Sequence, residues 1–399
     1  MKILLIEPNI SGHHISLYLI PLIDSLLKKK TKITLVASKL FKKNKNFKSL
    51  KKNSNIKFFF IDSYENDHRT NFLSLISKQV RYYYAFKRCF KKIKDKPDYI
   101  FINSFNTIDK IFPILGSPFQ NTKISGFFSS IKFHLNQINS FQSRFKYFID
   151  FYLFKKLISN NNITKIFMPD PLGVKFLKNK NFNNSNKVEL TNDFGLIIKQ
   201  KFLKKEKLRI KFKKKLNIFK DNYIILVYGF IRKEKCINYL INTIKNFKFS
   251  KNIKIIVAGE QANEIKLYLN EEKKKNNLIK KNVIIFDKFI SSELEKKLFI
   301  ISDLVWTGYD KNYYGSSGVF FLSSLMNKPV LTSNHGLINW YNKRYKIGKS
   351  IDISSQTQVY ETIQNFINKK IKIPKKNYTY VNKKHNYKQF CEKVTKSFI

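Results

Sequence analysis

Short apolar segments alternate with longer amphipathic segments along the chain, and this alternation constrains the fold more than any other feature of the sequence. The apolar segments are rich in β-branched and aromatic residues and are bounded by Asn, Pro, Ser or Asp, so they predict buried strands. In the first half these strands are expected at 3–7, 33–37, 57–61, 99–103, 123–127 and 163–168. The segments 14–29, 72–92 and 141–158 have the length and periodicity of helices. Such alternation predicts a parallel sheet with helices on both faces.

The pattern restarts in the second half of the chain. Strands are expected at 223–228, 253–258, 282–286, 303–306 and 329–332, and helices at 237–246, 263–275, 292–300 and 319–326. The lysine-dense stretch 197–222 separates the two patterns, so the boundary is expected near 195–203, with domains at 1–199 and 200–385. The predicted fold class is α/β, with two Rossmann-like doubly wound domains. Ligands of such sheets bind at the carboxyl ends of the strands, here in a cleft that both domains face.

The charge of the chain is strongly positive, with 77 Lys and Arg against 27 Asp and Glu and a formal net charge of +50. Only 7 of the 77 basic residues are Arg, and the lysines are spread over the whole sequence. Proteins that read nucleic acid favour the planar arginine fork, so a nucleic-acid partner is not expected. Solvated lysine faces are the favoured explanation of the charge, and a surface this cationic should also be attracted to anionic lipid headgroups or acidic glycans.

The cysteines and the N-terminal residues indicate the cellular compartment of the protein. Cys89, Cys236 and Cys391 stand far apart with no histidine cluster beside them, so neither a zinc site nor a disulfide framework is expected, which fits a reducing cytoplasm. Glu7 and Pro8 interrupt the first apolar run before it reaches the length of a signal peptide, and no stretch reaches the length of a membrane span.

Two glycine turns are candidate sites on the first strand of each half. Gly12, His13 and His14 follow the first strand and open a helix, where free backbone N–H groups could meet an anion or a substrate hydroxyl; an ordinary first helical turn is the alternative. In the second half Gly229 follows a strand, and the cations of Arg232 and Lys235 come shortly after it. Two cations at this place would suit a diphosphate, although ordinary surface charge remains the alternative.

A third segment carries the most specific pattern. Trp306 to Tyr309 is followed by a glycine-serine turn, Gly315, Ser316, Ser317 and Gly318, which opens a helix. Such a turn presents backbone amides and hydroxyls to phosphate. A flexible loop is the alternative, but the position between two apolar strands favours a binding loop.

In this order of residues the chain resembles the GT-B glycosyltransferases of family 4, which are mostly retaining enzymes that use nucleotide sugars. The matching positions are Gly229, Lys235, 257–259, 302–305 and 328–330. The resemblance implies that Lys235 and Arg232 hold the donor diphosphate, with the amides of Gly315 to Gly318 beneath it. It also places Gly259 and Tyr309 in the nucleotide-sugar site and Phe289 beside the base, and it implies that 386–399 returns to the first domain.

The sequence departs from the family in several places. Tyr314 and Leu322 stand where the family carries two glutamates, and Cys236 replaces a glycine. His134 is the best candidate for a family histidine near the reaction centre, and an ordinary surface histidine is the alternative. The aromatic helix at 72–92 could lie on a membrane, but packing on the sheet is preferred.

These observations predict a cytoplasmic, metal-independent glycosyltransferase, possessing no cofactor beyond its nucleotide-sugar co-substrate. It would transfer a sugar to a glycan or lipid-linked acceptor in surface polysaccharide assembly, with retention of configuration and peripheral contact with anionic membrane. Positioning and stabilisation of the departing diphosphate would provide most of the catalysis. The alternative is a catalytically degenerate GT-B scaffold or glycan-binding protein.

Overall fold

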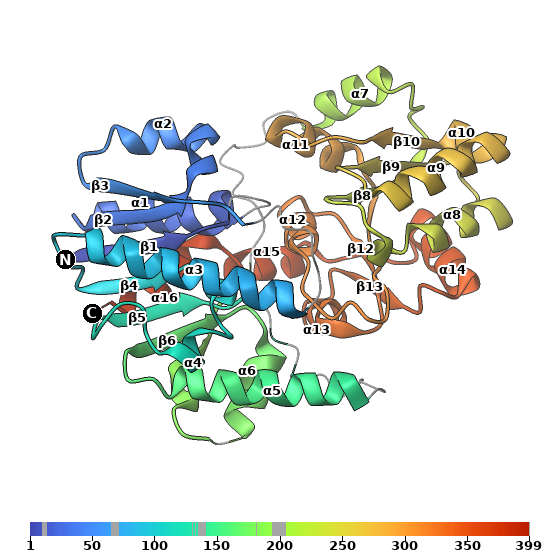
Figure 1. Ribbon diagram of the computed structural model, residues 1–399. Coiled ribbons are helices and arrows are strands. Elements are labelled where there is room, and N and C mark those ends of the chain that lie inside the picture. Colours follow the sequence, from blue (N-terminus) through green and yellow to red (C-terminus); the bar gives the residue numbers. More distant parts are fainter. Residues whose placement is uncertain are drawn as a thin grey trace. The chain divides into compact units, whose positions relative to one another are not determined.

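The computed structural model describes residues 1–9, 14–64, 72–129, 131, 133–134, 141–180, 182–193 and 205–398. The chain forms two compact units (Figure 1). The first unit comprises Met1–Asn192 together with Asn386–Ile399, and the second comprises Asp193–His385. The C-terminal segment therefore belongs to the unit that also contains the N-terminus.

The first unit is built on a parallel sheet. In the described part of the chain this sheet has seven strands in the order β3-β2-β1-β4-β5-β6-β7. The strands are β1 (Lys2–Glu7), β2 (Lys32–Ser38), β3 (Ile56–Ile61), β4 (Tyr99–Ile102), β5 (Lys123–Phe127), β6 (Ile163–Met168) and β7 (Val188–Leu190). The helices are α1 (Ile20–Lys28), α2 (Lys45–Lys51), α3 (Phe72–Lys92), α4 (Phe112–Leu115), α5 (Phe141–Ile158), α6 (Pro171–Asn179) and α16 (Tyr387–Lys396). The strand order reverses between β1 and β4, as in a doubly wound fold.

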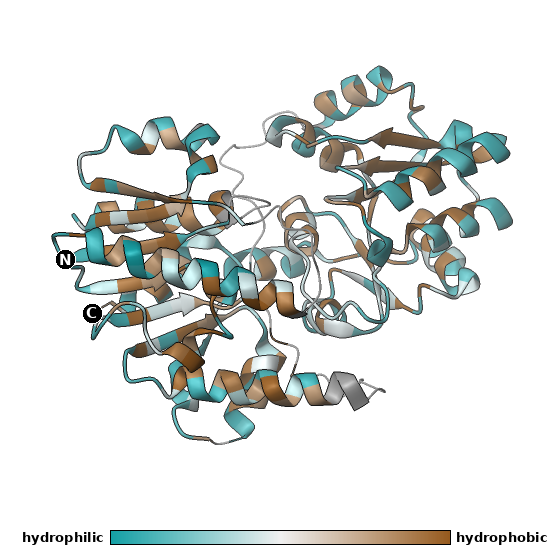
Figure 2. Cartoon of the chain, in the orientation of Figure 1, coloured by the Kyte–Doolittle hydropathy of each residue, from teal (hydrophilic) through white to brown (hydrophobic). Residues whose placement is uncertain are grey.

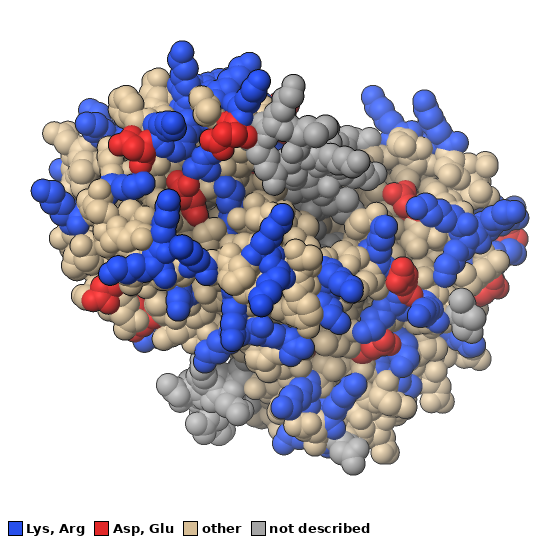
Figure 3. Space-filling view, turned by 180° about the vertical axis from the view of Figure 1, so that it is seen from behind, with Lys and Arg blue, Asp and Glu red and all other residues tan. Residues whose placement is uncertain are grey.

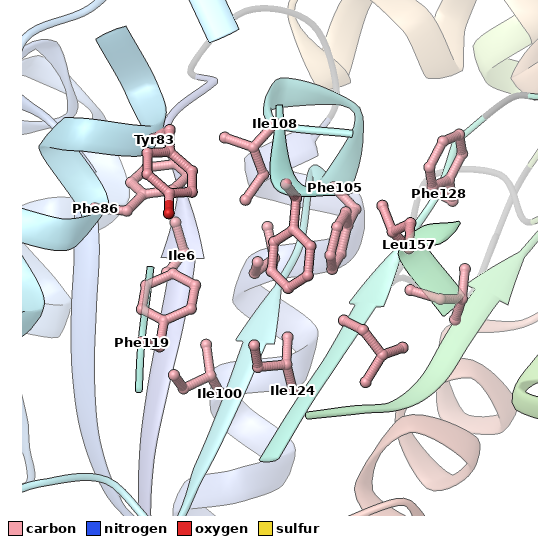
Figure 4. Packing of buried hydrophobic residues seen from close by; sticks show 14 of the residues in the cluster. Ile6, Tyr83, Phe86, Ile100, Phe105, Ile108, Phe119, Ile124, Phe128 and Leu157 are labelled. Carbon is pink, nitrogen blue, oxygen red and sulfur yellow. The ribbon is translucent and has the colours of Figure 1, made fainter. Parts of the chain in front are cut away.

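Along the central strands, the side chains of successive residues point to opposite faces of this sheet. Ile6 and Ile100 face a core that α3 and α5 complete with aromatic and aliphatic side chains, among them Phe86 and Leu157 (Figure 4). On the other face the ring of Phe101 lies 5.9 Å from that of Phe398, near the end of the chain. The aromatic helix α3 thus packs on the sheet, as the sequence favoured.

The second unit repeats the same design. Within the described residues its parallel sheet has six strands in the order β10-β9-β8-β11-β12-β13. The strands are β8 (Tyr223–Tyr228), β9 (Ile253–Ala258), β10 (Val283–Phe286), β11 (Leu304–Thr307), β12 (Val330–Ser333) and β13 (Gly348–Ile351). The helices are α7 (Lys205–Lys215), α8 (Ile237–Asn246), α9 (Asn263–Lys275), α10 (Asn277–Asn282), α11 (Ser292–Ile301), α12 (Gly318–Leu325), α13 (Gly336–Tyr345), α14 (Gln356–Ile367) and α15 (Lys375–Lys384). The strand order reverses between β8 and β11.

Hydropathy follows this architecture in both units. Most strands are mainly hydrophobic, whereas the helices carry hydrophilic residues on part of their circumference (Figure 2). Lysine and arginine side chains are spread over the visible face of the molecule, with few acidic side chains among them (Figure 3). Among the described helices, none combines the length and the apolar composition that crossing a membrane requires.

One predicted helix differs from expectation at its start. The segment expected to be helical from residue 14 begins as a π-helical turn at His14–Leu19, and the regular helix α1 begins only at Ile20. Pro21 occupies the first turn of α1. Proline has no N–H to donate to the preceding turn, so a regular helix begins at such a residue more readily than it continues through it.

Candidate functional site

The loops that follow β8 and β9 in the second unit touch each other through two glycines. Gly229 and Gly259 both have positive φ angles, +94° and +138°. A Cβ atom placed on Gly259 would lie 1.9 Å from the carbonyl oxygen of Gly229, which is far inside van der Waals contact. The close approach of the two loops therefore requires Gly259, whereas at Gly229 it is the positive φ that favours glycine. Gly229 lies where the strand order reverses, the place at which ligands of doubly wound sheets bind.

Lys235 brings a cation to the end of β8. It ends a short 3-10 turn, Lys233–Lys235, and its Nζ donates a hydrogen bond of 2.7 Å to the carbonyl oxygen of Tyr228. The same Nζ lies 3.4 Å from the hydroxyl of Tyr309, which follows β11. The indole N–H of Trp306 donates to the Lys235 carbonyl oxygen at 2.8 Å. The ammonium is thus held between the ends of the two strands at the reversal point.

Arg232 lies close by but is arranged differently. Its Nε is 3.8 Å from a carboxylate oxygen of Glu234, and its guanidinium lies 5.8 Å from the centre of the Phe230 ring. The side chain is 46% exposed. Arg232 is therefore accessible to a ligand, whereas Lys235 is anchored by backbone and side-chain contacts.

The loop after β11 is organised by two stacked tyrosines. The rings of Tyr309 and Tyr313 lie 4.2 Å apart at an interplanar angle of 16°. The Tyr309 hydroxyl is 2.9 Å from the hydroxyl of Ser317, and the Tyr313 hydroxyl donates to the carbonyl oxygen of Ser316 at 2.7 Å. Burial raises the pKa of Tyr313, so its hydroxyl keeps the proton that it donates. These contacts hold the glycine-serine turn in a defined conformation.

This turn leads directly into the N-terminus of α12. The Ser317 side chain makes no capping hydrogen bond to the helix, and its hydroxyl pairs with that of Tyr309. A Cβ atom placed on Gly318 would meet no atom within 4 Å. The first backbone N–H groups of a helix have no partner within the helix and carry partial positive charge. The turn therefore leaves open space beside an anion-attracting helix terminus.

Three other residues that the sequence assigned to this site are placed less centrally. Phe289 follows β10 and is 75% exposed, but β9 separates its strand from β8. Tyr314 is half-buried, and its carbonyl oxygen accepts a hydrogen bond from the Leu337 N–H at 2.8 Å. Leu322 is only 3% exposed and lies in the interior of the second unit. A nucleotide contact by any of the three stays a prediction.

Two residues of this arrangement were missed by sequence reasoning. Tyr313 supports the turn, and Asp193 accepts a hydrogen bond from the Ser316 hydroxyl. The paired tyrosines before the turn were a visible signal for Tyr313. Asp193 is 123 residues away from Ser316, and nothing local in the sequence connects the two.

Of the four candidate residues of the first unit, only His134 has a described side chain. Gly12 and His13 lie outside the described residues, and of His14 only the backbone is described, as the start of the π-helical turn. The His134 side chain is 4% exposed, with Nε2 at 3.2 Å from a carboxylate oxygen of Asp170. Asp170 also caps α6 by accepting from two backbone N–H groups. His134 is therefore a paired histidine with a buried side chain, and a catalytic role stays a prediction.

Among the described residues, no three His, Cys, Asp or Glu side chains are grouped as metal ligands. The positive charge of the site in the second unit comes from Lys235, Arg232 and the start of α12.

Residues 209–385 match the family of glycosyl transferases group 1. The match contains the two glycine loops, Lys235, the stacked tyrosines and the start of α12. The matched residues make up most of the second unit. The resemblance to this group, and with it the predicted glycosyltransferase, is confirmed. The chain matches no curated protein sequence at a significant level.

Solved structures extend the likeness to the whole chain. A glycosyltransferase from Rickettsia africae is 15% identical with a TM-score of 0.67, covering 100% of this chain and 97% of its own. HepE from Anabaena, in complex with UDP-glucose, is 12% identical with a TM-score of 0.66, covering 100% and 99%. WaaG, a glycosyltransferase of lipopolysaccharide biosynthesis, is 13% identical with a TM-score of 0.66, covering 99% and 98%. At such identities the likeness shows the fold, and the predicted GT-B fold is confirmed.

Proposed function

We propose that the protein transfers a sugar from a nucleoside diphosphate sugar to a glycan or lipid-linked acceptor. The observation that carries the proposal is the position of Lys235, held at the strand-order reversal between Tyr228 and Tyr309 and close to the start of α12. A diphosphate placed there would meet a fixed ammonium and unpartnered helix N–H groups. HepE, whose structure contains UDP-glucose, has the same fold, which supports a UDP-sugar as the donor.

The chemistry follows from where charge develops. When the bond between the sugar and the diphosphate breaks, negative charge accumulates on the leaving phosphate oxygens. Lys235 and the amides of Ser317 and Gly318 would stabilise this charge in fixed positions, which costs no reorganisation during the reaction. Arg232 is exposed enough to close onto the diphosphate after it binds. The retaining outcome that the family 4 resemblance implies needs no additional nucleophile in this arrangement.

We place this activity in surface polysaccharide assembly at the inner face of the membrane. The likeness to WaaG, which acts in lipopolysaccharide biosynthesis, supports such an acceptor. The excess of 77 basic over 27 acidic residues supports contact with anionic lipid.

The decisive experiment is a screen of the purified full chain against UDP, GDP, ADP and TDP and their sugars. A ligand that binds only the native state raises the unfolding temperature, so at least one of these compounds should do so. The release of the nucleoside diphosphate from its sugar should then continue in the presence of EDTA, since the proposal assigns charge neutralisation to protein groups. If none of the nucleotides raises the unfolding temperature at millimolar concentration, the scaffold alternative replaces the enzyme.

A further inference from the structure

The first unit contains a cavity of about 300 Å³ at the carboxyl edge of its sheet. Asp109 and Lys110 follow β4, and Phe128 follows β5, which pairs with β4. α5 contributes Asp150 and Phe154. The volume is at the lower end of the range for small-molecule pockets. The loops at this edge of a doubly wound sheet are where a ligand is expected.

One part of the cavity lining is a buried cluster of three charges. The Lys110 Nζ lies 3.1 Å from a carboxylate oxygen of Asp109 and 2.8 Å from one of Asp150. The three side chains are 15%, 9% and 18% exposed, respectively. Burial acts to lower the pKa of Lys110, but the two carboxylates outweigh it and the pKa is raised, so the ammonium stays charged. Burial raises the pKa of Asp109, which opposes ionisation of its carboxyl group.

Gln79 of α3 fixes this cluster in place. Its Nε2 donates to Asp109 at 2.6 Å, and its Oε1 accepts from the backbone N–H of Lys110 at 2.8 Å. Each Asp109 oxygen thus has a protein partner, one in Gln79 and the other in Lys110. Asp150 offers one oxygen to Lys110, and its other carboxylate oxygen has no hydrogen-bond partner within the described part of the chain. That oxygen can accept from a ligand hydroxyl.

The remainder of the lining combines aromatic side chains with aliphatic and polar ones: Phe128, Phe133, Tyr147 and Phe154 lie beside Leu75, Ile131, Asn106 and Lys146. Phe128 and Phe154 stand edge to face, with ring centres 5.6 Å apart, and Tyr147 lies one helical turn before Asp150. Aromatic faces carry negative charge density and attract weakly positive C–H groups. A ligand that presents C–H groups on one side and hydroxyls on the other would match both parts of this cavity.

We propose that this cavity binds a neutral sugar ring of the acceptor. The hydroxyls of such a ring would donate to Asp150 and accept from Lys110, and its C–H face would lie on the aromatic residues. The cavity lining has two acidic and two basic side chains, since Lys146 joins Lys110 there, so hydroxyl binding and aromatic contact, not net charge, distinguish this site from the diphosphate site of the second unit. The proposal rests on the glycosyl transfer proposed above and assigns its acceptor side to named residues.

The test measures sugar binding and nucleotide binding separately on the full chain. Methyl glycosides of glucose, galactose and mannose are titrated by saturation-transfer NMR. We expect at least one of them to bind. Asp150→Asn should lower the affinity for the glycoside about tenfold, because one charge-assisted hydrogen bond is lost. Asp95→Asn is the matched control, because Asp95 is an exposed carboxylate that pairs with Lys2 and Lys57 outside the cavity.

Binding of UDP and the unfolding temperature are measured for the same variants, and Tyr147→Phe serves if Asp150→Asn fails to fold. Glycoside binding unchanged in the folded cavity variants, or UDP binding without binding of any methyl glycoside, would overturn the cavity proposal alone. Glycoside binding that depends on Asp150 without any nucleotide binding would uphold the cavity and overturn the proposed transfer reaction.

Discussion

At the scale of single residues, Lys235 is the best test of the proposed donor site. Lys235→Ala removes an ammonium that would make a charge-assisted contact with the diphosphate, so UDP should bind more weakly by about 1.5–3 kcal/mol. The unfolding temperature should fall only slightly, since the hydrogen bond lost to Tyr228 is worth about 1 kcal/mol. Lys233→Ala removes an exposed lysine from the same turn and is the control. Calorimetry that finds equal UDP affinity in both variants would remove Lys235 from the site.

Two glycines of the site should respond in opposite ways to the same substitution. Gly318→Ala places its methyl group in open space, so the unfolding temperature should not change. The affinity for UDP should fall about tenfold, because that space is where the phosphate would lie. Gly259→Ala places its methyl group against Gly229 at positive φ and should destabilise the fold by about 2–4 kcal/mol. Thermal unfolding with and without UDP measures both effects. Wild-type affinity in Gly318→Ala would show that phosphate does not approach the start of α12.

At the scale of secondary structure, apolar patterning was sufficient for the central elements. The central strands of both sheets match the predicted ranges to within one residue, and α3, α5, α8 and α9 match in full. The edge strands β7 and β13 were missed. β13 contains Lys349 and Ser350 between its end residues and has no fully buried residue, so it lacks the continuous apolar run by which buried strands are predicted.

For the site residues too, positions next to a predicted strand could be predicted from the sequence, whereas contacts between distant segments could not. The chemistry of Lys235, Tyr309 and the glycine-serine turn was predictable, because each follows a strand that the sequence already indicated. The cluster of Asp109, Lys110 and Asp150 was not. Its members come from two segments that meet only after β4 and α5 have packed together, so no spacing along the chain reveals it.

The helix α16 allows a prediction about how the C-terminal segment is held. Phe390 is fully buried and lies 5.3 Å from the Tyr18 ring and 5.9 Å from the Phe127 ring. Burial raises the pKa of the neighbouring Cys391 thiol to about 12, so little reactive thiolate exists at neutral pH. Phe390→Ala should cost about 3–4 kcal/mol of packing and make Cys391 open to alkylation.

Cys236 serves as the internal control, because it belongs to the second unit and burial likewise raises its thiol pKa to about 12. Alkylation by iodoacetamide followed by peptide mass spectrometry separates the two thiols. Lys388→Ala changes an exposed residue of α16 and should leave both thiols protected from alkylation. Equal protection of Cys391 in Phe390→Ala and in the wild type would show that α16 is not held by this contact.

At the scale of the whole molecule, one histidine joins the two ends of the second unit. His385 is its last residue, and Nδ1 of its ring lies 2.6 Å from the carbonyl oxygen of Asp193, its first residue. A carbonyl oxygen can only accept, so Nδ1 carries the proton. Nε2 of the neutral ring then accepts from the Tyr345 hydroxyl, at 2.7 Å. Asp193 in turn accepts from Ser316, so the contact that joins the unit's ends continues into the candidate diphosphate loop.

This contact should make the stability of the protein depend on pH. Burial lowers the pKa of His385 to about 4, whereas the unfolded chain has the ordinary value of about 6.5. Between these values the unfolded state binds a proton that the folded state does not, so stability is complete above about pH 6.5 and is lost as the pH falls towards 4. His385 alone should contribute a loss of about 2 kcal/mol of unfolding free energy between pH 7 and pH 5.

The variant His385→Phe tests this pH dependence, because it keeps an aromatic ring against Phe321 but cannot titrate. Urea unfolding of both proteins at the two pH values isolates this contribution, because all other groups cancel in the difference. A variant that loses as much stability as the wild type between pH 7 and pH 5 would show that His385 is not the buried neutral group that joins the ends of the unit.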